Sequence, residues 1–482
     1  MTAESGSQRV TKRNVHVLLD STTATAEEVA RTLRSVRGQR AISPVITIVR
    51  TPTTSSENGH GVAGPDPVLW IQAGTELLPA AVGRLLAIFD RFDACAVYAD
   101  GRARIVGRTT ALRRPDYSPL RLLEQDYLGD AVLVRLEAGA PLPSSRLELQ
   151  LHVLSLDAGA VVHVPETLAR RQTSIPTASD VERRAAIAAR LARAGINAQV
   201  ETTSPGELRI RFPPIGLPLV SIIIPSRGSS AFIRGRDRVL LVEAVRSIVE
   251  RSSYPAFEFV IVADDETPQS VIDDVIAIAQ DRVRIVRWSQ PFNFSAKINR
   301  GAAHARGELL LLLNDDVELI STDWLETMIG LCQMDGVGMV GAELLFEDGT
   351  LQHAGHFYRA RGADHIALGW SPEQDDGLGA MRVDREVAGV TAACALVSRK
   401  LFAEVGGFST LLPGNYNDVD FSLKVRRTGA RIIWTPWARL YHFESMSREP
   451  ATADAELQRL RARWGTRMEV DPYWPEDARP VG

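Results

Sequence analysis

The sequence of 482 residues is longer than one hydrophobic core usually fills, so we expect two domains. Its 55 basic and 59 acidic residues give a formal net charge of −4, which excludes a strongly basic binding surface, and we predict no nucleic-acid partner. Three scattered cysteines form no CxxC pair, which excludes a disulfide scaffold and a structural zinc site.

Membrane segments are not expected from the sequence. No apolar run reaches the roughly 18–20 residues that a membrane-spanning helix requires. The first residues also lack the apolar core of a secretory signal. We therefore expect a cytoplasmic protein and leave open a peripheral contact with the inner face of the cytoplasmic membrane. The sequence does not indicate which oligomeric state the protein has.

The first half of the chain ends in a proline-rich connection. Residues 51–67 are rich in small and polar residues and predict an exposed loop. A helix is expected at residues 178–194, and a short strand follows it at residues 208–212. We place the domain boundary near Phe212–Pro218. The resulting division is 1–213 for the N-terminal domain, 214–450 for the second domain and 451–482 for a C-terminal extension.

Strands and helices alternate beyond this boundary. The apolar run Leu219–Pro225 predicts a parallel strand that is buried on both faces. Thr267 and Pro268 are predicted as the N-cap and the first residue of a helix. This alternation is typical of a doubly wound α/β sheet, which binds ligands beyond the carboxyl ends of its strands. Further strands are expected at residues 257–265, 283–288 and 308–313, and further helices at 239–251 and 295–306.

The first domain resembles a decayed copy of the second. VLWIQAGTELLPAAVGRLL, from Val68, matches LLLLNDDVELISTDWLETM, from Leu310, in its apolar pattern. Gln72-Ala73-Gly74 stands where the second copy has Asn314-Asp315-Asp316. A second block agrees in the same order, residues 147–150 with residues 417–420. Because Ala73 and Gly74 replace two carboxylates, we predict that the first domain holds no metal.

Acidic residues follow two of the predicted strands. Asp315 and Asp316 come directly after the apolar run that ends at Leu313, and Asp264 and Asp265 end an earlier strand. Carboxylates at the mouth of a buried strand are costly unless a cation offsets their charge. A divalent Mg²⁺ or Mn²⁺ ion held by one carboxylate and substrate phosphates is the usual solution. The alternative is that these residues only end the strand in an Asx turn.

The segment GNYNDVDFSLKVRRTG allows two interpretations. Asn417 or Asp418 caps a helix, with Gly429 as its C′ residue and Asp420 favourable to the helix dipole. Alternatively, Asp418 is a general base that removes a proton from a hydroxyl group. Both interpretations stay open at this level.

A histidine follows the last predicted strand, in the motif YHFESMSR. His442 in such a place is more often structural than a ligand. A neutral imidazole there is also able to complete a metal shell begun by Asp316.

Taken together, these motifs resemble the family 2 glycosyltransferases over about residues 217–448. They are most similar to two-domain bacterial members that make polysaccharides and O-antigens, and the N-terminal DYSPLRLLEQDYLGDAVLVR resembles the same group. The motifs occur in the order LVSIIIPSR, VIVADD, FNFSAKINRGA, RGELLLLLNDDVE, LQHAGHFY, TAACALVSRKLFAEVGGF, NDVDFSLKVRRTGARI and YHFESMSR. The order is specific, although no single motif is.

The resemblance implies a GT-A fold, a degenerate GT-A-like first domain and an inverting, metal-dependent transfer from a nucleotide-sugar donor. It implies Asp418 as the base, and Asp316 and His442 at a Mn²⁺ or Mg²⁺ ion that stabilises the departing nucleoside diphosphate. The implied acceptor is a glycan or a lipid-linked molecule in the synthesis of cell-surface polysaccharide. The residues implied in donor binding are Pro225, Ser226, Arg227, Asp264, Asp265, Lys297 and Asp315.

The sequence departs from the family pattern at Asn314, Asn417, Ala392 and Glu266-Thr267. None of these changes removes a group that the implied reaction requires. Two alternatives remain, a non-catalytic module that binds nucleotide-sugar or glycan, and a sugar nucleotidyltransferase. The second usually carries a Gly-rich, phosphate-binding loop after its first strand, and PSRGSSAFIRGR has no such spacing.

Overall fold

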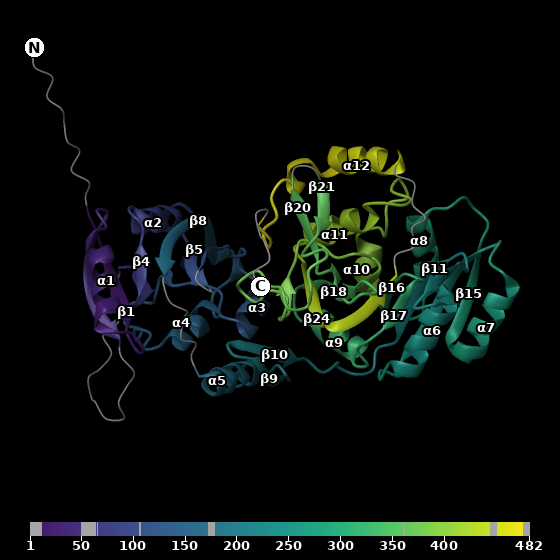
Figure 1. Cartoon of the computed structure of the whole chain (residues 1–482), viewed down its shortest axis with the longest axis horizontal. Helices are drawn as coiled ribbons and strands as arrows, with labels where there is room; N and C mark the ends of the chain where they lie inside the picture. Colours follow the sequence, from purple (N-terminus) through teal and green to yellow (C-terminus); the bar gives the residue numbers. More distant parts are fainter. Residues whose placement is uncertain are drawn as a thin grey trace, which may run out of the picture. The chain divides into compact units, whose positions relative to one another are not determined.

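A computed structural model describes residues 12–49, 64, 66–105, 108–171, 179–359, 362–443 and 451–475 (Figure 1). Two compact units are present, one formed by residues 1–189 and 202–208 and the other by residues 190–201 and 209–482. Within the described part, no helix is long and apolar enough to cross a membrane. Most of the expected loop at 51–67, and residues 444–448 of the YHFESMSR motif, lie outside the described residues.

The first unit is an α/β unit built on a mixed sheet. Its strand order is β2-β1-β3-β7-β5-β8-β4, with β6 paired to β5. Its elements are β1 (Arg13–Asp20), α1 (Ala26–Arg37), β2 (Ile42–Val49), β3 (Val68–Gln72), β4 (Thr75–Leu77), α2 (Ala81–Arg91), β5 (Ala96–Ile105), β6 (Arg108–Leu112), α3 (Pro119–Glu124), β7 (Ala131–Val134), α4 (Arg146–Val153) and β8 (Val161–Arg171). Helix α5 (Asp180–Arg193) and the hairpin of β9 (Gln199–Ser204) and β10 (Glu207–Arg211) follow in the sequence.

The second unit is also α/β, with strand order β15-β14-β11-β16-β23-β18-β24-β17. Its first elements are β11 (Val220–Ser226), β12 (Ser230–Ile233), β13 (Arg236–Val239), α6 (Leu240–Arg251), β14 (Phe257–Asp264), α7 (Gln269–Ala279), β15 (Val283–Trp288), α8 (Phe294–His304), β16 (Leu309–Leu313), β17 (Val317–Leu319) and α9 (Trp324–Cys332). The rest are β18 (Val337–Leu345), β19 (Leu351–His353), β20 (His356–Arg359), β21 (Gly362–His365), β22 (Arg385–Glu386), β23 (Cys394–Ser398), α10 (Arg399–Glu404), α11 (Asn417–Arg427), β24 (Arg431–His442) and α12 (Ala451–Trp464).

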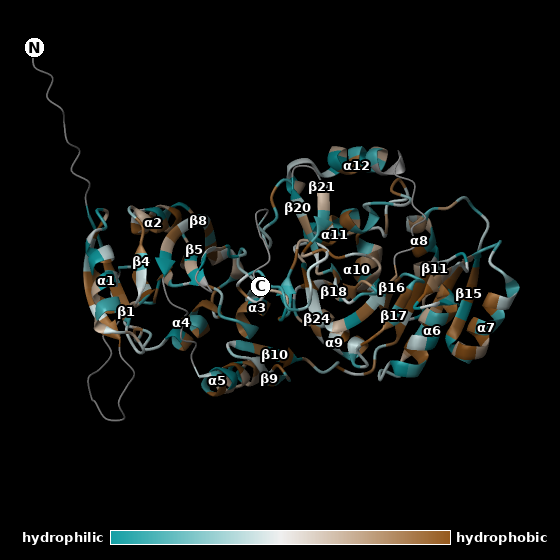
Figure 2. Cartoon of the chain, viewed as in Figure 1, coloured by the Kyte–Doolittle hydropathy of each residue, from teal (hydrophilic) through white to brown (hydrophobic). Residues whose placement is uncertain are grey.

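The central strands form where the sequence has continuous apolar runs. All five leucines of β16 are buried, because this strand lies between β11 and β23 in the middle of the sheet. Figure 2 shows the strands around β11 and β15 largely in the brown of apolar residues. The predicted α/β class is confirmed, and β15, β14, β11 and β16 run parallel as expected. The predicted cap of α7 was wrong, because Pro268 has an extended ψ of 135° and is itself the N-cap.

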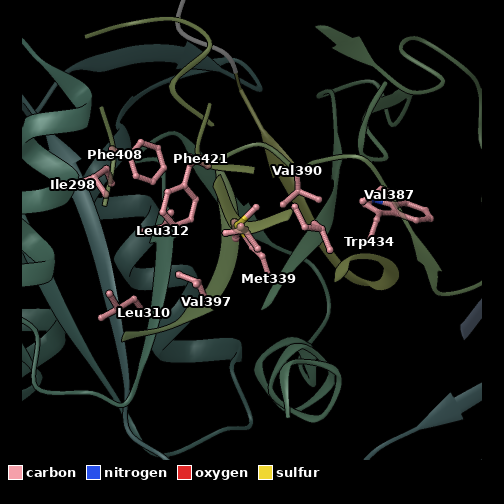
Figure 3. Packing of buried hydrophobic residues seen from close by; sticks show 14 of the residues in the cluster. Ile298, Leu310, Leu312, Met339, Val387, Val390, Val397, Phe408, Phe421 and Trp434 are labelled. Carbon is pink, nitrogen blue, oxygen red and sulfur yellow. The ribbon is translucent and has the colours of Figure 1, made fainter. Parts of the chain in front are cut away.

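Helix α11 is fixed to the sheet by aromatic packing. Phe421 of this helix stacks on Phe408 with ring centroids 4.6 Å apart, and Figure 3 shows both rings beside Leu312 of β16. These side chains belong to one buried cluster that continues to Trp434 of β24. Gly429, with a φ of 87°, ends the helix in the left-handed conformation predicted for its C′ position. The packing holds the first turn of α11, with Asp418, at a fixed place.

The sheets of the two units have the same topology. Removal of β15 from the second sheet leaves an order that matches the first, strand by strand. The directions match as well, since β1–β2 and β1–β3 are parallel like β11–β14 and β11–β16, and the later pairs agree in turn. Helices α4 and α11 occupy equivalent places before β8 and β24. This agreement supports the duplication that the sequence predicts.

An arginine of the first unit stands where the second unit has His442. Arg171 pairs with Thr75 at the start of β4, as His442 pairs with Val317 at the start of β17. Its guanidinium group is buried and bonds Asp130 Oδ1 at 2.8 Å. The positive charge near Ala73 and Gly74 in the first unit is thus the Arg171 side chain, which Asp130 already neutralises. That arrangement agrees with the prediction that it holds no metal, which stays a prediction.

Loss of Asp130 should destabilise the first unit strongly. Asp130→Ala leaves a buried guanidinium group without its carboxylate, which costs about 3 kcal/mol of unfolding free energy. Asp90→Ala, which removes an exposed ion pair with Arg13 in the same unit, should cost less than about 1 kcal/mol. Chemical denaturation followed by circular dichroism measures both, and equal losses would contradict the role given to Asp130.

Candidate active site

Pairing of β17 with β24 brings together two residues that are far apart in the sequence. Val317 lies opposite His442 in this antiparallel pair, so the residue before Val317 lies next to the histidine. Asp316 Oδ1 is 3.1 Å from His442 Nε2, and the Phe443 amide donates to the Asp316 carbonyl oxygen at 2.9 Å. The two predicted metal ligands therefore form one group at the edge of the sheet.

Hydrogen bonds define the tautomer of His442. Gln352 Nε2 donates to the His442 carbonyl oxygen at 3.2 Å, which orients the amide so that Gln352 Oε1 faces His442 Nδ1 at 2.5 Å. The hydrogen of the neutral imidazole is therefore on Nδ1. The lone pair on Nε2 faces Asn314 Nδ2, which donates to it at 3.0 Å, and the Asp316 carboxylate.

This donor set fits a divalent cation. An imidazole lone pair and a carboxylate oxygen repel each other unless something positive lies between them, and at present the Asn314 amide donates to His442 Nε2. Ligand atoms about 2.1 Å from an octahedral ion at right angles lie about 3 Å apart, close to the separation here. Gln352 supplies the outer hydrogen bond that orients a metal-binding histidine. Asp316 and His442 would hold the ion after Asn314 releases Nε2.

Asp315 points to the neighbouring strand. Ser226, at the end of β11, donates through Oγ to Asp315 Oδ2 at 2.5 Å and accepts from the Gly228 amide at 2.9 Å. Burial, together with the charge of Asp316, raises the pKa of Asp315 to about 6. Pro225 and Ser226 are both buried, so the end of β11 is a rigid support for Asp315.

The two acids after β14 differ in their surroundings. Asp264 Oδ1 is 2.5 Å from Lys297 Nζ, an ion pair in which the lysine of α8 is almost fully buried. Asp265 is exposed, and its backbone amide bonds the Trp288 carbonyl oxygen at 3.1 Å. The pair Asp264–Lys297 ties α8 to the carboxyl end of β14. The donor-binding roles predicted for these residues stay predictions.

Two pockets meet at His442. The predicted base, Asp418, and both predicted metal ligands, Asp316 and His442, line a pocket of about 610 Å³. A second pocket of about 880 Å³ is lined by Arg227, by strand β12, by residues 346–348 and 350, and by His442 and Phe443. Arg227 is exposed there and bonds Ser229 Oγ through Nε at 2.9 Å. Asp264, Asp265 and Lys297 line neither of these two pockets.

Asp418 lies in the first turn of α11 but does not cap it. The N-cap is Tyr416, with a φ of 56° and no side-chain cap bond, so the capping interpretation of Asn417 or Asp418 was wrong. Asp418 Oδ1 accepts from the Val419 amide at 2.8 Å, and Oδ2 faces the Ala392 amide at 3.4 Å and His356 Nε2 at 3.8 Å. The carboxylate is thus directed to the pocket by donors around it.

The electrostatics keep Asp418 ionised. Burial alone would raise the pKa of its carboxyl group, but the imidazoles of His356 and His365 and hydrogen bonds from Thr391 and Val419 outweigh it and lower that pKa. Burial lowers the pKa of His356 to about 4, so this imidazole is neutral at neutral pH. The neutral ring of His356, with Nε2 3.8 Å from Asp418 Oδ2, leaves the carboxylate available as a base.

Three histidines beside Asp418 form a cluster, with one ring nitrogen of each within 4.8 Å of the others, namely His353, His356 and His365. The Thr391 amide donates to His353 Nε2 at 3.1 Å, which puts the ring hydrogen on Nδ1. His353 Nδ1 in turn donates to His365 Nδ1 at 2.9 Å. Because the lone pair of His353 is already used, this arrangement suits a hydrogen-bonded chain and not a metal.

The sequence interpretation gave no role to Gln352, His356, His365 or Thr391. The sequence did contain a signal for some of them. Gln352, His353 and His356 lie within the six-residue segment LQHAGH, where they are close to small apolar residues, and all three side chains are buried. His442, the partner of Gln352, and Asp418, the partner of His356, are more than 50 residues away from them, and no local pattern connects them.

Residues 221–406 match the protein family described as Glycosyl transferase family 2. The chain contains a family 2 glycosyltransferase domain. The matched segment of the chain includes Asp316 and Gln352, whereas Asp418 and His442 follow it in the sequence. The match bears out the resemblance stated from the motifs and agrees with the α/β sheet of the second unit.

Relatives extend the likeness beyond the matched domain. The chain is 32% identical to "Uncharacterized protein y4gI" of Sinorhizobium fredii, over 96% of this chain and 54% of that protein. It is 30% identical to "O-antigen biosynthesis protein RfbC" of Myxococcus xanthus, over 95% of this chain and 37% of that protein. The chain thus spans about half the length of these curated relatives, or less. A solved structure, "GalNAc-T7 with UDP, GalNAc and Mn2+", is similar at a TM-score of 0.41 and 16% identity, over 51% of this chain and 48% of that chain.

Substitution of Asp316 tests the metal group. Asp316→Asn should abolish Mn²⁺-dependent binding of a nucleoside diphosphate, because it removes the carboxylate that faces His442 Nε2. Titration calorimetry with UDP, GDP and dTDP, each with and without Mn²⁺, measures this, and the matched control Asp274→Asn changes an exposed acid of α7 that lines neither pocket. Unchanged metal-dependent affinity in Asp316→Asn would rule out the assignment. If Asp316→Asn still bound Mn²⁺ and nucleotide weakly, a second binding site would be indicated. Such a site would speak against the prediction that the first unit holds no metal.

Proposed function

We propose that the chain transfers a sugar from a nucleotide-sugar donor to a hydroxyl group of a glycan or lipid-linked acceptor, with inversion at the anomeric carbon. We further propose that this transfer serves the synthesis of cell-surface polysaccharide. The family 2 domain and the O-antigen relative support the reaction class and its setting.

One observation carries the proposal. Asp418 lines the same pocket as Asp316 and His442, so a base and a candidate metal group face one space of about 610 Å³. A sugar transfer needs both, because a hydroxyl group must lose a proton and a diphosphate must leave. The pocket is large enough for the sugar and the attacking group together.

In the proposed reaction, the acceptor oxygen attacks the anomeric carbon as its proton passes to Asp418. The bond from that carbon to the diphosphate oxygen breaks, and its electron pair leaves with the nucleoside diphosphate. A Mn²⁺ or Mg²⁺ ion, when bound, offsets the negative charge of this leaving group. Asp316 and His442 would hold the ion, and Gln352 would keep His442 in the tautomer with its lone pair on Nε2. A single displacement inverts the configuration.

The two alternatives predict different products. A non-catalytic binding module would bind the donor and release nothing, and a nucleotidyltransferase would release pyrophosphate when it joins a nucleoside triphosphate to a sugar 1-phosphate. A screen of UDP-, GDP- and dTDP-sugars with Mn²⁺, read by nucleoside diphosphate release, identifies the transferase. A second assay with nucleoside triphosphates and sugar 1-phosphates, read by pyrophosphate release, separates the other two. We expect release of a nucleoside diphosphate from one class of donor.

Substitution of Asp418 tests the base. Asp418→Asn keeps the shape of the side chain and an oxygen that accepts from Val419, but it removes the basicity. General-base catalysis contributes roughly 10²–10⁴-fold, so we expect transfer at least about a hundredfold slower with donor and metal binding retained. Steady-state kinetics and titration calorimetry measure the two effects.

Asp420 is the matched comparison, because it lies in the same helical turn. It is fully buried and bonds Trp464 Nε1 at 2.8 Å and Arg463 Nη1 at 3.1 Å, which assigns it to structure. Asp420→Asn should lower the melting temperature and keep most of the turnover per folded molecule. Near-normal turnover in Asp418→Asn, or a greater loss in Asp420→Asn, would transfer the role of base away from Asp418.

A further inference from the structure

A carboxylate of the last helix holds the loop that leads into α11. Glu456 of α12 is almost fully buried. Its Oε1 accepts from the Gly414 amide at 2.9 Å, and its Oε2 accepts from the Asn415 amide and from Asn415 Nδ2, each at 2.8 Å. Hydrogen bonds to an ionised acceptor are stronger than neutral ones, so three of them on one carboxylate constrain this loop firmly.

This loop is a wall of the pocket that contains Asp418. Gly414, Asn415 and Tyr416 all line the pocket. Tyr416, the N-cap of α11, has a φ of 56°, a left-handed conformation that non-glycine residues adopt at a cost. Such a conformation persists only where neighbouring contacts hold it. Two residues further along the chain is Asp418, so the shape of the loop sets the start of the helix that carries it.

Helix α12 is attached to α11 at further points, and Figure 1 shows it beside α11. Trp464 and Arg463 bond Asp420 in the first turn of α11. Leu460 and Trp464 belong to a buried cluster with Val419 of α11. Arg459 Nη1 donates to the Leu411 carbonyl oxygen at 3.0 Å, so α12 also bonds this loop three residues before Gly414. Glu456 is the contact that reaches the wall of the pocket.

We propose that Glu456 is a positioning residue for the acceptor side of the site. It fixes the Gly414–Tyr416 wall against which an acceptor would lie and the first turn of α11, and so directs Asp418 to the acceptor hydroxyl group. The proposal rests on the proposed transferase function. It makes α12 a working part of the catalytic unit and not a separable extension.

The test compares two variants of α12 in the full chain. Glu456→Gln keeps the size of the side chain but turns an amide N–H group toward one of the backbone donors, so it disrupts the loop. Leu460→Ala weakens the packing of α12 on α11 and leaves the three hydrogen bonds of Glu456 in place. Asp454→Asn, at an exposed position of the same helix, controls for the change in charge.

Hydrogen–deuterium exchange by mass spectrometry reads the loop, and nucleoside diphosphate release reads turnover. We expect peptides with Gly414 and Asn415 to exchange at least tenfold faster in Glu456→Gln and not in Asp454→Asn. We also expect kcat about tenfold lower in Glu456→Gln than in Leu460→Ala, with Mn²⁺-dependent nucleotide affinity unchanged. Rescue by Glu456→Asp, which keeps a charged acceptor, should be partial.

Unchanged exchange at Gly414 and Asn415 in Glu456→Gln would overturn the proposal. It would also be overturned by faster exchange with normal kcat, or by an equal loss of kcat in Leu460→Ala at a matched melting temperature, because either result leaves Glu456 a purely structural role. A wild-type chain that releases no nucleoside diphosphate from any donor would contradict the transferase function itself. The exchange data would then still decide whether Glu456 orders the loop.

Discussion

The candidate site depends on the short antiparallel pairing between β17 and β24. That pairing sets Val317 opposite His442 and thereby places the Asp316 carboxylate beside the imidazole. Strand β17 follows β16 after a turn of three residues, and β24 is the last strand before α12. The first ligand is therefore supplied by the buried centre of the sheet, and the second by a strand that enters about 120 residues later. Without this pairing, the acid-rich turn would remain, but Asp316 would not have His442 beside it.

Local patterns were enough to predict the strands and the acids at their ends. The leucines of β16 and the apolar run of β11 are long enough to define buried parallel strands, and the end of a strand is where Asp316 must lie. The same patterns did not separate Asp418 from Asp420, because both occupy the first turn of α11. Only the tertiary contacts do so, since Asp420 is bonded to Trp464 whereas Asp418 faces the pocket.

The contacts that sequence reasoning missed all join distant segments. Gln352 orients His442 across 90 positions, and Glu456 bonds Gly414 across 42. The predicted N-caps of α7 and α11 were wrong for a different reason. Pro268 and Tyr416 occupy the N-cap positions, and neither makes a side-chain capping hydrogen bond. Their backbone conformations are imposed by surrounding structure, and the residue types usual at caps gave the wrong positions.

The two units differ in how charge is balanced at equivalent positions of their sheets, where His442 lies in the second unit and Arg171 in the first. In the second unit, Asp316 and His442 lie together, and we propose that a cation joins them. In the first, Arg171 and Asp130 neutralise each other. This proposal predicts that the first domain is indifferent to the supply of metal, whereas its counterpart responds to it.

Strand β24 also has an irregularity before it reaches the site. Ala342 of β18 pairs with Thr435, but the next residue, Glu343, pairs with Arg439, so three residues of β24 are looped out of register. Side chains alternate between the faces of a strand, so the number of residues in this bulge decides which of Tyr441, His442 and Phe443 faces Asp316. A single-codon deletion in this bulge would therefore present an aromatic ring to the carboxylate. Chain length at this point is a requirement in its own right, separate from the packing of the buried Pro436 and Ala438.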